Sequence, residues 1–249
     1  MDEQELVKKR LLDLSRQADN RQFVTFSGFL NLNEQNIYHS LCKEFFTRTE
    51  LFGGYDYAER QMVAFIPDAL CYGWNYPICC IEARPLYPKF AEDFNHRDVL
   101  GAVMHLGIER NRIGDILCSN KRAYIFCEEG IGTFILENLT QIRHTMMQLS
   151  LMRDCSKLSI QPEFEEHEDM VASNRIDAII ARAYHLSRSE AAAYIAADKV
   201  FINGKSVNCN SACESGSIVS VRGKGRFVFE TDQILSKKGK LRVRFRMYR

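Results

Sequence analysis

The sequence lacks any long apolar run, and this absence excludes a membrane-spanning helix. No stretch of the 249 residues approaches the roughly 20 consecutive apolar residues that such a helix needs. The first ten residues, MDEQELVKKR, are charged and contain no hydrophobic segment of the signal-peptide type. We therefore expect a soluble, cytoplasmic protein without a membrane partner.

Metal-binding and disulfide patterns are also missing, although nine cysteines are present. The number is odd, no C-x-x-C pair occurs, and neither Cys79-Cys80 nor Cys209 and Cys213 have histidines at zinc-finger spacing. The six histidines show no ligand-like spacing. Most cysteines lie within apolar runs, which predicts buried free thiols in a reducing compartment and no metal site.

The local signatures of common active sites are absent as well. The sequence has no Walker loop, no G-x-S-x-G elbow, no H-E-x-x-H and no G-x-G-x-x-G after a strand. His96-Arg97-Asp98 matches the catalytic-loop triplet of protein kinases, but the Asn expected five residues after the Asp is Val103. We therefore expect a protein that is not an enzyme and needs no cofactor.

The net charge of +1 hides an uneven distribution of charge. Residues 222–249 contain ten Lys/Arg against Glu230 and Asp232, a local balance of +8, so the rest of the chain carries −7. An excess of basic residues in one segment is typical of surfaces that bind a polyanion. This basic tail predicts affinity for nucleic acid.

Apolar periodicity and turn residues predict an α+β protein. Residues 1–74 form an N-terminal α+β region, with helices expected over 3–19 and about 33–47 and two strands or one bent strand over 51–67. Residues 75–155 show the order β-α-β-β-α-β of a ferredoxin-like, RRM-like domain, in which Tyr124 and Phe126 are expected to be core aromatics. Residues 156–172 are predicted to be an acidic linker, and residues 173–249 a small C-terminal domain with the basic tail.

Residues 173–205 carry the most specific local pattern. They predict a first short helix, Arg175–Ala183, preceded by Ser173, and a second helix opened by a capping box of Ser187 and Glu190. After Val200-Phe201-Ile202, the pair Asn203-Gly204 predicts a β-hairpin.

This order of elements resembles the alpha-L RNA-binding module, which is named after small-subunit ribosomal protein S-four. The matching residues are Arg175, Asp177, Ser187, Arg188, Ala191, Val200, Ile202, Asn203 and Gly204. One departure is Asp198, which replaces the glycine usual at the end of the second helix and has to tolerate a left-handed backbone.

The resemblance implies contact with structured RNA, recognised through shape and phosphates. The residues expected to contact RNA are Arg175, Ser187, Arg188, Lys199, Asn203 and Lys205, with Lys224 and Arg226 adding phosphate contacts. For Arg175 and Arg188, the alternative is an ion pair with Asp177 or Glu190.

The middle segment of the chain and residues upstream of it carry a second resemblance, to the YlmH family of bacterial proteins. The similar segments are residues 52–54, 58–60, 89–90, 96–102, 106–108 and 112–116. Members of this family combine an RRM-like domain with a C-terminal alpha-L domain and are encoded near cell-division genes. The resemblance implies a monomer that binds rRNA and peptidyl-tRNA on the large ribosomal subunit, in ribosome-associated quality control with C-terminal tailing.

Two questions stay open from the sequence. His96, Arg97, Arg112 and Asp115 form either a second RNA contact or a structural group in which Asp115 pairs with Arg97 or Arg112. The alternative functions are an RNA-modifying enzyme or accessory factor, since alpha-L modules are often attached to such enzymes, and a scaffold for cell-division proteins.

Overall fold

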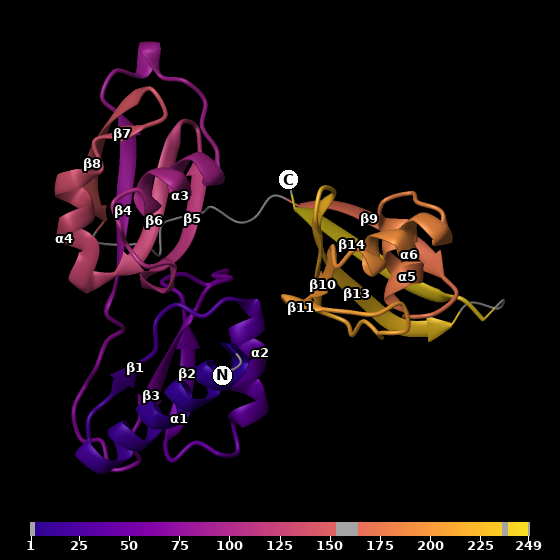
Figure 1. The fold of residues 1–249 in the computed structure, drawn as a ribbon, viewed down its shortest axis with the longest axis horizontal. Coiled ribbons are helices and arrows are strands. Elements are labelled where there is room, and N and C mark those ends of the chain that lie inside the picture. Colours follow the sequence, from indigo (N-terminus) through magenta and orange to yellow (C-terminus); the bar gives the residue numbers. More distant parts are fainter. Residues whose placement is uncertain (1–2, 153–163, 236–238, 249) are drawn as a thin grey trace. The chain divides into compact units, whose positions relative to one another are not determined.

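The computed structural model describes residues 3–152, 164–235 and 239–248, and the chain divides into two compact units, Met1–Ile160 and Gln161–Arg249 (Figure 1). Helices pack against antiparallel sheets in both units, which confirms the predicted α+β class. Within the described ranges, no helix combines the length and apolar character needed to cross a membrane.

The first unit begins with a three-stranded sheet of order β1-β3-β2 and two helices. The elements are α1 (Glu3–Arg21), β1 (Thr25–Phe26), α2 (Leu32–Leu41), β2 (Arg48–Phe52) and β3 (Met62–Ile66). One face of the sheet packs on the helices through Leu11, Tyr38 and Phe65. The opposite face packs on the segment that contains Trp74 and Tyr76.

Helix α2 is shorter than predicted and begins earlier. Its cap is Asn31, not Asn33, and Asn31 forms a capping box with Glu34. The helix ends at Leu41 rather than near residue 47. The chain then turns so that Phe45 packs on Tyr38 and Phe65, a tertiary contact that local periodicity does not reveal.

The RRM-like part of the first unit has the predicted β-α-β-β-α-β order. Its elements are β4 (Ile78–Pro85), α3 (His96–Met104), β5 (Ile113–Ser119), β6 (Arg122–Glu128), α4 (Glu129–Asn138), β7 (Gln141–Ile142) and β8 (Thr145–Met152), with short 3-10 turns at Pro88–Phe90 and Arg110–Arg112. The sheet order β5-β6-β4-β8-β7 is that of a ferredoxin-like fold with a small extra strand at its edge.

The two faces of this sheet are covered by different parts of the chain. Ile81 and Ile125 face the core that includes Val99 of α3 and Ile135 of α4. Phe126 alternates to the other face, where the ring of Tyr55 stacks on it with centroids 4.8 Å apart. Phe126 is fully buried, as predicted for a core aromatic, whereas Tyr124 is only half-buried, so the prediction is wrong for Tyr124.

The cysteines only partly follow the prediction of buried thiols. Cys80, Cys127 and Cys213 are buried, whereas Cys42 and Cys71 are exposed. All eight cysteines in the described residues are free, and Cys155 lies outside those residues. Exposure at Cys71 follows from its place in the loop after β3, because loops run over the protein surface.

The second unit is a six-stranded antiparallel sheet of order β11-β10-β12-β13-β14-β9 with two helices. The elements are β9 (Phe164–Val171), α5 (Ile176–Ala183), α6 (Arg188–Ala196), β10 (Val200–Ile202), β11 (Lys205–Ser206), β12 (Ile218–Val221), β13 (Gly225–Leu235) and β14 (Leu241–Tyr248). Both helices lie on one face of the sheet (Figure 1). The core joins Ile179 and Ile195 to Phe227, Phe229 and Phe245.

The predicted linker is partly wrong. Residues 153–163 lie outside the described residues, but residues 164–171 form strand β9 at the edge of the second sheet. A run of charged residues is compatible with an edge strand when the neighbouring strand supplies opposite charges. Strand β14 supplies them through Arg242, Arg244 and Arg246.

Candidate nucleic-acid interface

Two arginines converge on one buried carboxylate at the junction of α5 and α6. Arg175 donates from Nε and Nη2 to Asp177 at 3.2 and 3.0 Å. Arg188 donates from Nη2 to Oδ2 of the same carboxylate at 2.7 Å. The Asp177 side chain is only 9% exposed, whereas those of Arg175 and Arg188 are 45% and 53% exposed. The group therefore carries a net charge of +1 and turns two guanidinium groups toward solvent.

Local structure fixes this arrangement. Arg175 is extended and occupies the N-cap position of α5, so the helix begins at Ile176 and Ser173 does not cap it. Burial alone would raise the pKa of Asp177, but the hydrogen bonds from Arg175 and Arg188 outweigh it, and the pKa lies below its ordinary value. The carboxylate is thus ionised at neutral pH and holds both arginines in place.

The start of α6 shows the predicted capping box. The Ser187 hydroxyl accepts from the Glu190 backbone N–H at 3.2 Å, and the Glu190 carboxylate accepts from the Ser187 backbone N–H at 2.8 Å. The Ser187 hydroxyl also donates to the Glu190 carboxylate at 2.7 Å. The hydrogen bond from the Ser187 backbone N–H, and then the one from its hydroxyl, lower the pKa of this carboxyl group. Ser187 therefore positions Arg188, and its side chain is engaged within the helix start.

A groove of about 510 Å³ runs beside Arg188 and contains basic residues that the sequence did not single out. The additional basic residues along it are Arg182, His185 and Lys240. Arg182 lies seven residues after Arg175, a helical spacing that could have indicated a shared face. Lys240 comes from far along the chain, so only the fold places it here.

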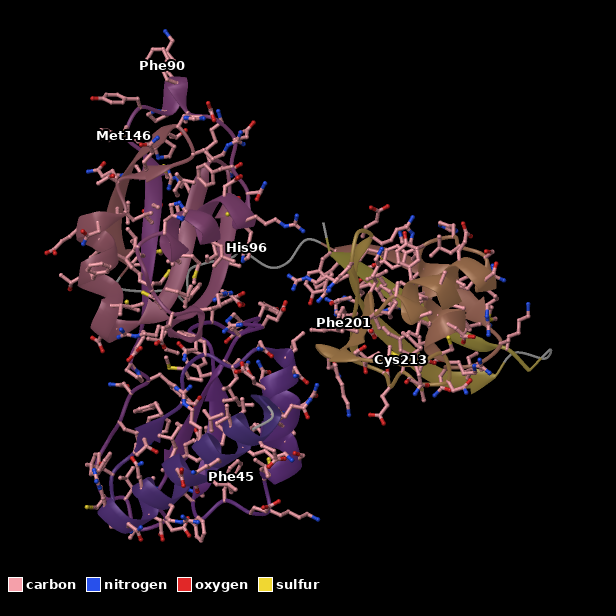
Figure 2. The ribbon with its side chains drawn as sticks, in the orientation of Figure 1. Phe45, Phe90, His96, Met146, Phe201 and Cys213 are labelled. Atoms are coloured by element: carbon pink, nitrogen blue, oxygen red, sulfur yellow. The ribbon has the colours of Figure 1, made fainter. Side chains whose placement is uncertain are left out.

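A second group of basic residues surrounds the turn between β12 and β13. The Arg222 backbone N–H donates to the Lys199 carbonyl at 2.8 Å. The hydrogen bonds from Ser187 are the main cause of the lowered pKa of Glu190, and the charge of Lys224 adds a smaller effect. Arg222 also lies over the ring of Phe201 in β10, 4.8 Å from its centroid; Figure 2 labels this ring. The structure therefore brings Lys199 and Lys224 near α6, and adds Arg222.

Asn203 and Gly204 shape the hairpin, whereas Lys205 turns to solvent. Asn203 and Gly204 have φ of +48° and +77°, as a two-residue turn of this type requires. The Asn203 side-chain oxygen accepts from the Ile218 backbone N–H at 2.8 Å, so that atom is engaged in the sheet. Lys205 is exposed on β11. Asp198 has φ of +50°, which confirms the predicted left-handed backbone, and its carboxylate accepts from the Ser206 hydroxyl at 3.0 Å.

The basic tail is more neutralised than its composition predicts. Arg242 and Arg244 donate to Glu168 at 2.7 and 3.1 Å, and Arg246 donates to Glu230 at 3.1 Å. Arg226 lies over the ring of Tyr248, 4.3 Å from its centroid. Side chains on neighbouring strands therefore engage four of the described tail arginines, namely Arg226, Arg242, Arg244 and Arg246.

The second predicted group does not assemble as one site. Asp115 accepts from the Tyr55 hydroxyl at 2.8 Å and from the backbone N–H groups of Glu59 and Arg60 at 2.7 and 3.0 Å. The expected pairing of Asp115 with Arg97 or Arg112 is therefore wrong. Arg112 instead forms an ion pair of 2.6 Å with Glu128.

The remaining members of that group lie at the exposed start of α3. His96 and Arg97 are the first two residues of this helix, after the Asn95 cap. The Arg97 backbone N–H donates to the Asn95 side chain at 2.8 Å. The Asp115 carboxylate, by contrast, ties the loop of residues 55–60 to the RRM-like sheet.

The chemistry of the Asp177 group suits binding of phosphate. Guanidinium groups recognise phosphate through several directed N–H donors, and such contacts position RNA without reading its sequence. Across the part of the chain that the structure describes, no three His, Cys, Asp or Glu side chains gather as a metal-binding group.

Comparison with known proteins identifies related sequences. Residues 76–154 match the family model described as "Putative RNA-binding domain in YlmH". A Bacillus subtilis (strain 168) protein named ribosome-associated protein quality control protein P2 is 28% identical over 239 residues, which cover 94% of this chain and 91% of that protein.

One solved structure supports the fold. It is the cell division protein ylmH from Streptococcus pneumoniae, matched with a TM-score of 0.51 and 22% sequence identity. The match covers 61% of this chain and 92% of that chain. At this identity the likeness concerns the fold alone.

Proposed function

Because this chain is a member of the YlmH family of RNA-binding proteins, we propose that it binds rRNA and tRNA on the large ribosomal subunit in ribosome-associated quality control. The specific role we propose is recognition of obstructed large subunits that carry peptidyl-tRNA, in support of C-terminal tailing. The name of the Bacillus subtilis relative supports the quality-control part of this proposal.

The arrangement of Arg175 and Arg188 around Asp177 is the observation that carries the proposal. Asp177 engages Nε and Nη2 of Arg175 and Nη2 of Arg188, and roughly half of each arginine side chain is exposed. A carboxylate that fixes two guanidinium groups reduces the entropy that they lose on binding an RNA phosphate. The nearby groove adds Lys240 and Arg182, although Arg182 also forms an ion pair of 3.7 Å with Asp169.

We propose that the protein acts by binding and without catalysis. The alpha-L-like helices and hairpin recognise structured RNA by shape, and the exposed Lys199, Lys205 and Lys224 add phosphate contacts. Mass spectrometry of rRNA and tRNA from a strain that lacks the gene should show every modification of the parent strain. A modification that is lost and then restored by the gene would favour an RNA-modifying role instead.

Sedimentation through sucrose gradients tests the binding proposal. The intact protein should migrate with large subunits that carry peptidyl-tRNA at low salt and be released as salt rises. Replacing Arg175 and Arg188 by Glu should weaken this association about ten-fold or more. A matched control replaces the exposed Arg16 and Arg21 of α1 by Glu, which makes the same change in charge elsewhere.

The milder double variant Arg175→Gln and Arg188→Gln tests whether the loss of association is caused by unfolding of the second unit. Circular dichroism should show the same helix and strand content as the parent protein, while the association is still weakened. Parent-like sedimentation of the Gln pair and of the Glu pair would contradict the proposal. Parent protein that stays at the top of the gradient with such subunits would contradict it as well.

A further inference from the structure

A cavity of about 450 Å³ lies in the first unit, between the N-terminal sheet and the RRM-like sheet. It is outside the interface described above, because that interface belongs to the second unit. The lining residues that matter here are Glu50, Phe52, Trp74, Asn75, Tyr76 and Phe126. A volume of this size is typical of sites for small organic groups.

Aromatic rings form the walls of the cavity, and further aromatic side chains pack against these rings. The Tyr76 ring centroid lies 5.2 Å from that of Phe52 and 5.1 Å from that of Trp74. Phe26 of β1 contacts Trp74 and Tyr76 with centroids 5.9 and 5.7 Å away. Phe126, at the RRM-like side, is fixed by its stack with Tyr55. These contacts hold the rings in place before any ligand binds, which lowers the entropic cost of stacking.

Two polar side chains at the cavity, Glu50 and Asn75, can form hydrogen bonds to a ligand. Among the described residues, neither the Glu50 carboxylate nor the Asn75 amide takes part in a side-chain hydrogen bond or an ion pair. Both residues are exposed. Glu50 and Tyr76 line the same cavity. Burial raises the pKa of Tyr76, and the charge of Glu50 raises it further.

The chemistry of the cavity selects a flat ligand with N–H donors. Rings of Phe, Trp and Tyr bind nucleobases by stacking, and an ionised carboxylate accepts hydrogen bonds but donates none. Guanine presents N1–H and the N2 amino group side by side, so both can donate to the two oxygens of one carboxylate. Adenine has an acceptor at N1, which would face a carboxylate oxygen unfavourably. An apolar side chain would offer the carboxylate no donor.

A cation lies beside Glu50 on the same face of β2. Arg48, Glu50 and Phe52 alternate with Thr49 and Leu51 along β2, so the first three side chains share one face of the strand. Arg48 is exposed and two residues from Glu50. The negative Glu50 disfavours a phosphate inside the cavity, whereas Arg48 favours one just outside it.

We propose that this cavity binds an unstacked guanine base, with the base stacked on Phe52 and Trp74, its Watson–Crick edge at Glu50, and its phosphate near Arg48. The inference extends the proposed RNA-binding function by adding a base-recognising site in the first unit. The same chemistry would accept guanine from single-stranded RNA or from a free nucleotide.

The single tryptophan of the chain provides a direct test, because Trp74 lines the cavity. Full-length protein is titrated with the RNA pentamers UUGUU, UUAUU and UUUUU, and separately with GMP and AMP, while tryptophan emission is recorded. Stacking should quench the emission with UUGUU at several-fold lower concentration than with UUAUU or UUUUU. Stronger binding of UUGUU than of GMP identifies RNA as the source of the base, and the reverse identifies a free nucleotide.

Substitutions at the cavity separate stacking from edge recognition. Phe52→Ala should weaken binding of UUGUU about five-fold or more, because one stacking surface is lost. Glu50→Gln should abolish the preference for UUGUU over UUAUU. The matched controls are Phe46→Ala, at a ring that is 50% exposed elsewhere in the unit, and Glu44→Gln, at another exposed carboxylate. Both controls should bind like the parent protein.

Three outcomes would overturn the proposal. They are no quenching by any pentamer or nucleotide, quenching that Phe52→Ala leaves unchanged, and equal binding of UUGUU and UUAUU by the parent protein. Filter binding of a structured rRNA hairpin, measured in parallel, reports on the second unit. If the protein binds the hairpin but Trp74 emission does not respond, the guanine site is rejected and the proposed function stands. If Trp74 emission responds but the hairpin is not bound, the proposed interface alone is rejected.

Discussion

Arg244 and Glu168 lie directly opposite each other on β14 and β9, and Nη2 of the arginine donates to Oε1 of the carboxylate at 3.1 Å. Arg242 donates to the other oxygen of Glu168 at 2.7 Å. The acidic segment before α5 and the basic segment at the end of the chain therefore belong to one sheet. Their opposite charges, which composition treats as separate features, partly cancel on its surface.

Replacing Glu168 by Gln should strengthen RNA binding at low salt. The hydrogen bonds from Arg242, then those from Arg244, lower the pKa of Glu168, so it is ionised at neutral pH and competes with RNA for both arginines. Without that charge, affinity should rise a few-fold and fall more steeply with salt. Filter binding of an rRNA hairpin at several salt concentrations measures both effects. Glu214→Gln, at an exposed carboxylate elsewhere in the unit, should change affinity less. Unchanged or weaker binding by Glu168→Gln would contradict this prediction.

Replacing Asp177 by Asn should lower the free energy of unfolding of the second unit by about 1–3 kcal/mol, because the charge that holds two arginines is lost. The cost should depend on pH. The pKa of Asp177 in the folded protein lies below its ordinary value of 3.8, so the unfolded chain takes up the proton first as pH falls. The stabilisation is thus present above that value and is lost as pH decreases through the folded pKa.

Urea unfolding at pH 7, 5 and 3 tests the Asp177 prediction. The difference between the parent protein and Asp177→Asn should be largest at pH 7 and should narrow at pH 3. Glu214→Gln serves as the control and should show a small difference at every pH. A difference that stays constant down to pH 3 would mean that the charge of Asp177 is not the stabilising feature.

Asp198 should tolerate Gly but not Ala. At φ of +50° a side chain with a Cβ is strained, and Asp offsets part of that strain through its hydrogen bond to Ser206. Asp198→Ala keeps the strain and loses the bond, so it should cost about 1 kcal/mol. Asp198→Gly removes both the strain and the hydrogen bond, so its free energy of unfolding should lie within about 0.5 kcal/mol of that of the parent protein. The two variants are compared by urea unfolding, and an Ala variant as stable as the Gly variant would refute this explanation.

Replacing Asp115 by Ala should destabilise the first unit by about 2–3 kcal/mol, since the N–H groups of Glu59 and Arg60 lose their acceptor. Tyr55→Phe removes a single hydrogen bond to the same carboxylate and should cost about 1 kcal/mol. Asp93→Ala, at a side chain that is 91% exposed, is the control. Thermal unfolding followed by circular dichroism compares the three variants. Equal effects of Asp115→Ala and Asp93→Ala would show that the tie between loop and sheet contributes little.

Much of the fold follows from local signals in the sequence. The order β-α-β-β-α-β was predictable from alternating apolar runs, and the α6 capping box and the Asn203-Gly204 turn from residue types with specific backbone preferences. Element ends were predicted less well. Helix α2 stops at Leu41 because tertiary packing of Phe45 competes with the helical periodicity.

The candidate site was predictable only in part. The sequence pattern singled out Arg175 and Arg188, whereas the groove residues Arg182, His185 and Lys240 come together only in the folded unit. Asn203 and Ser187 carry the pattern of the module, yet the structure uses their side chains in the turn and the helix cap. Local pattern does not distinguish residues that bind RNA from residues that shape the surface that binds it.

The sequence by itself determined the elements with short-range causes, since caps, turns and apolar periodicity act within a few residues. Only the tertiary structure decided the pairing of charges, because the partners lie far apart along the chain. Asp115 meets the backbone of residues 59 and 60, and Glu168 meets Arg242 and Arg244. Electrostatic attraction depends on distance in space, and that distance exists only once the sheets have formed.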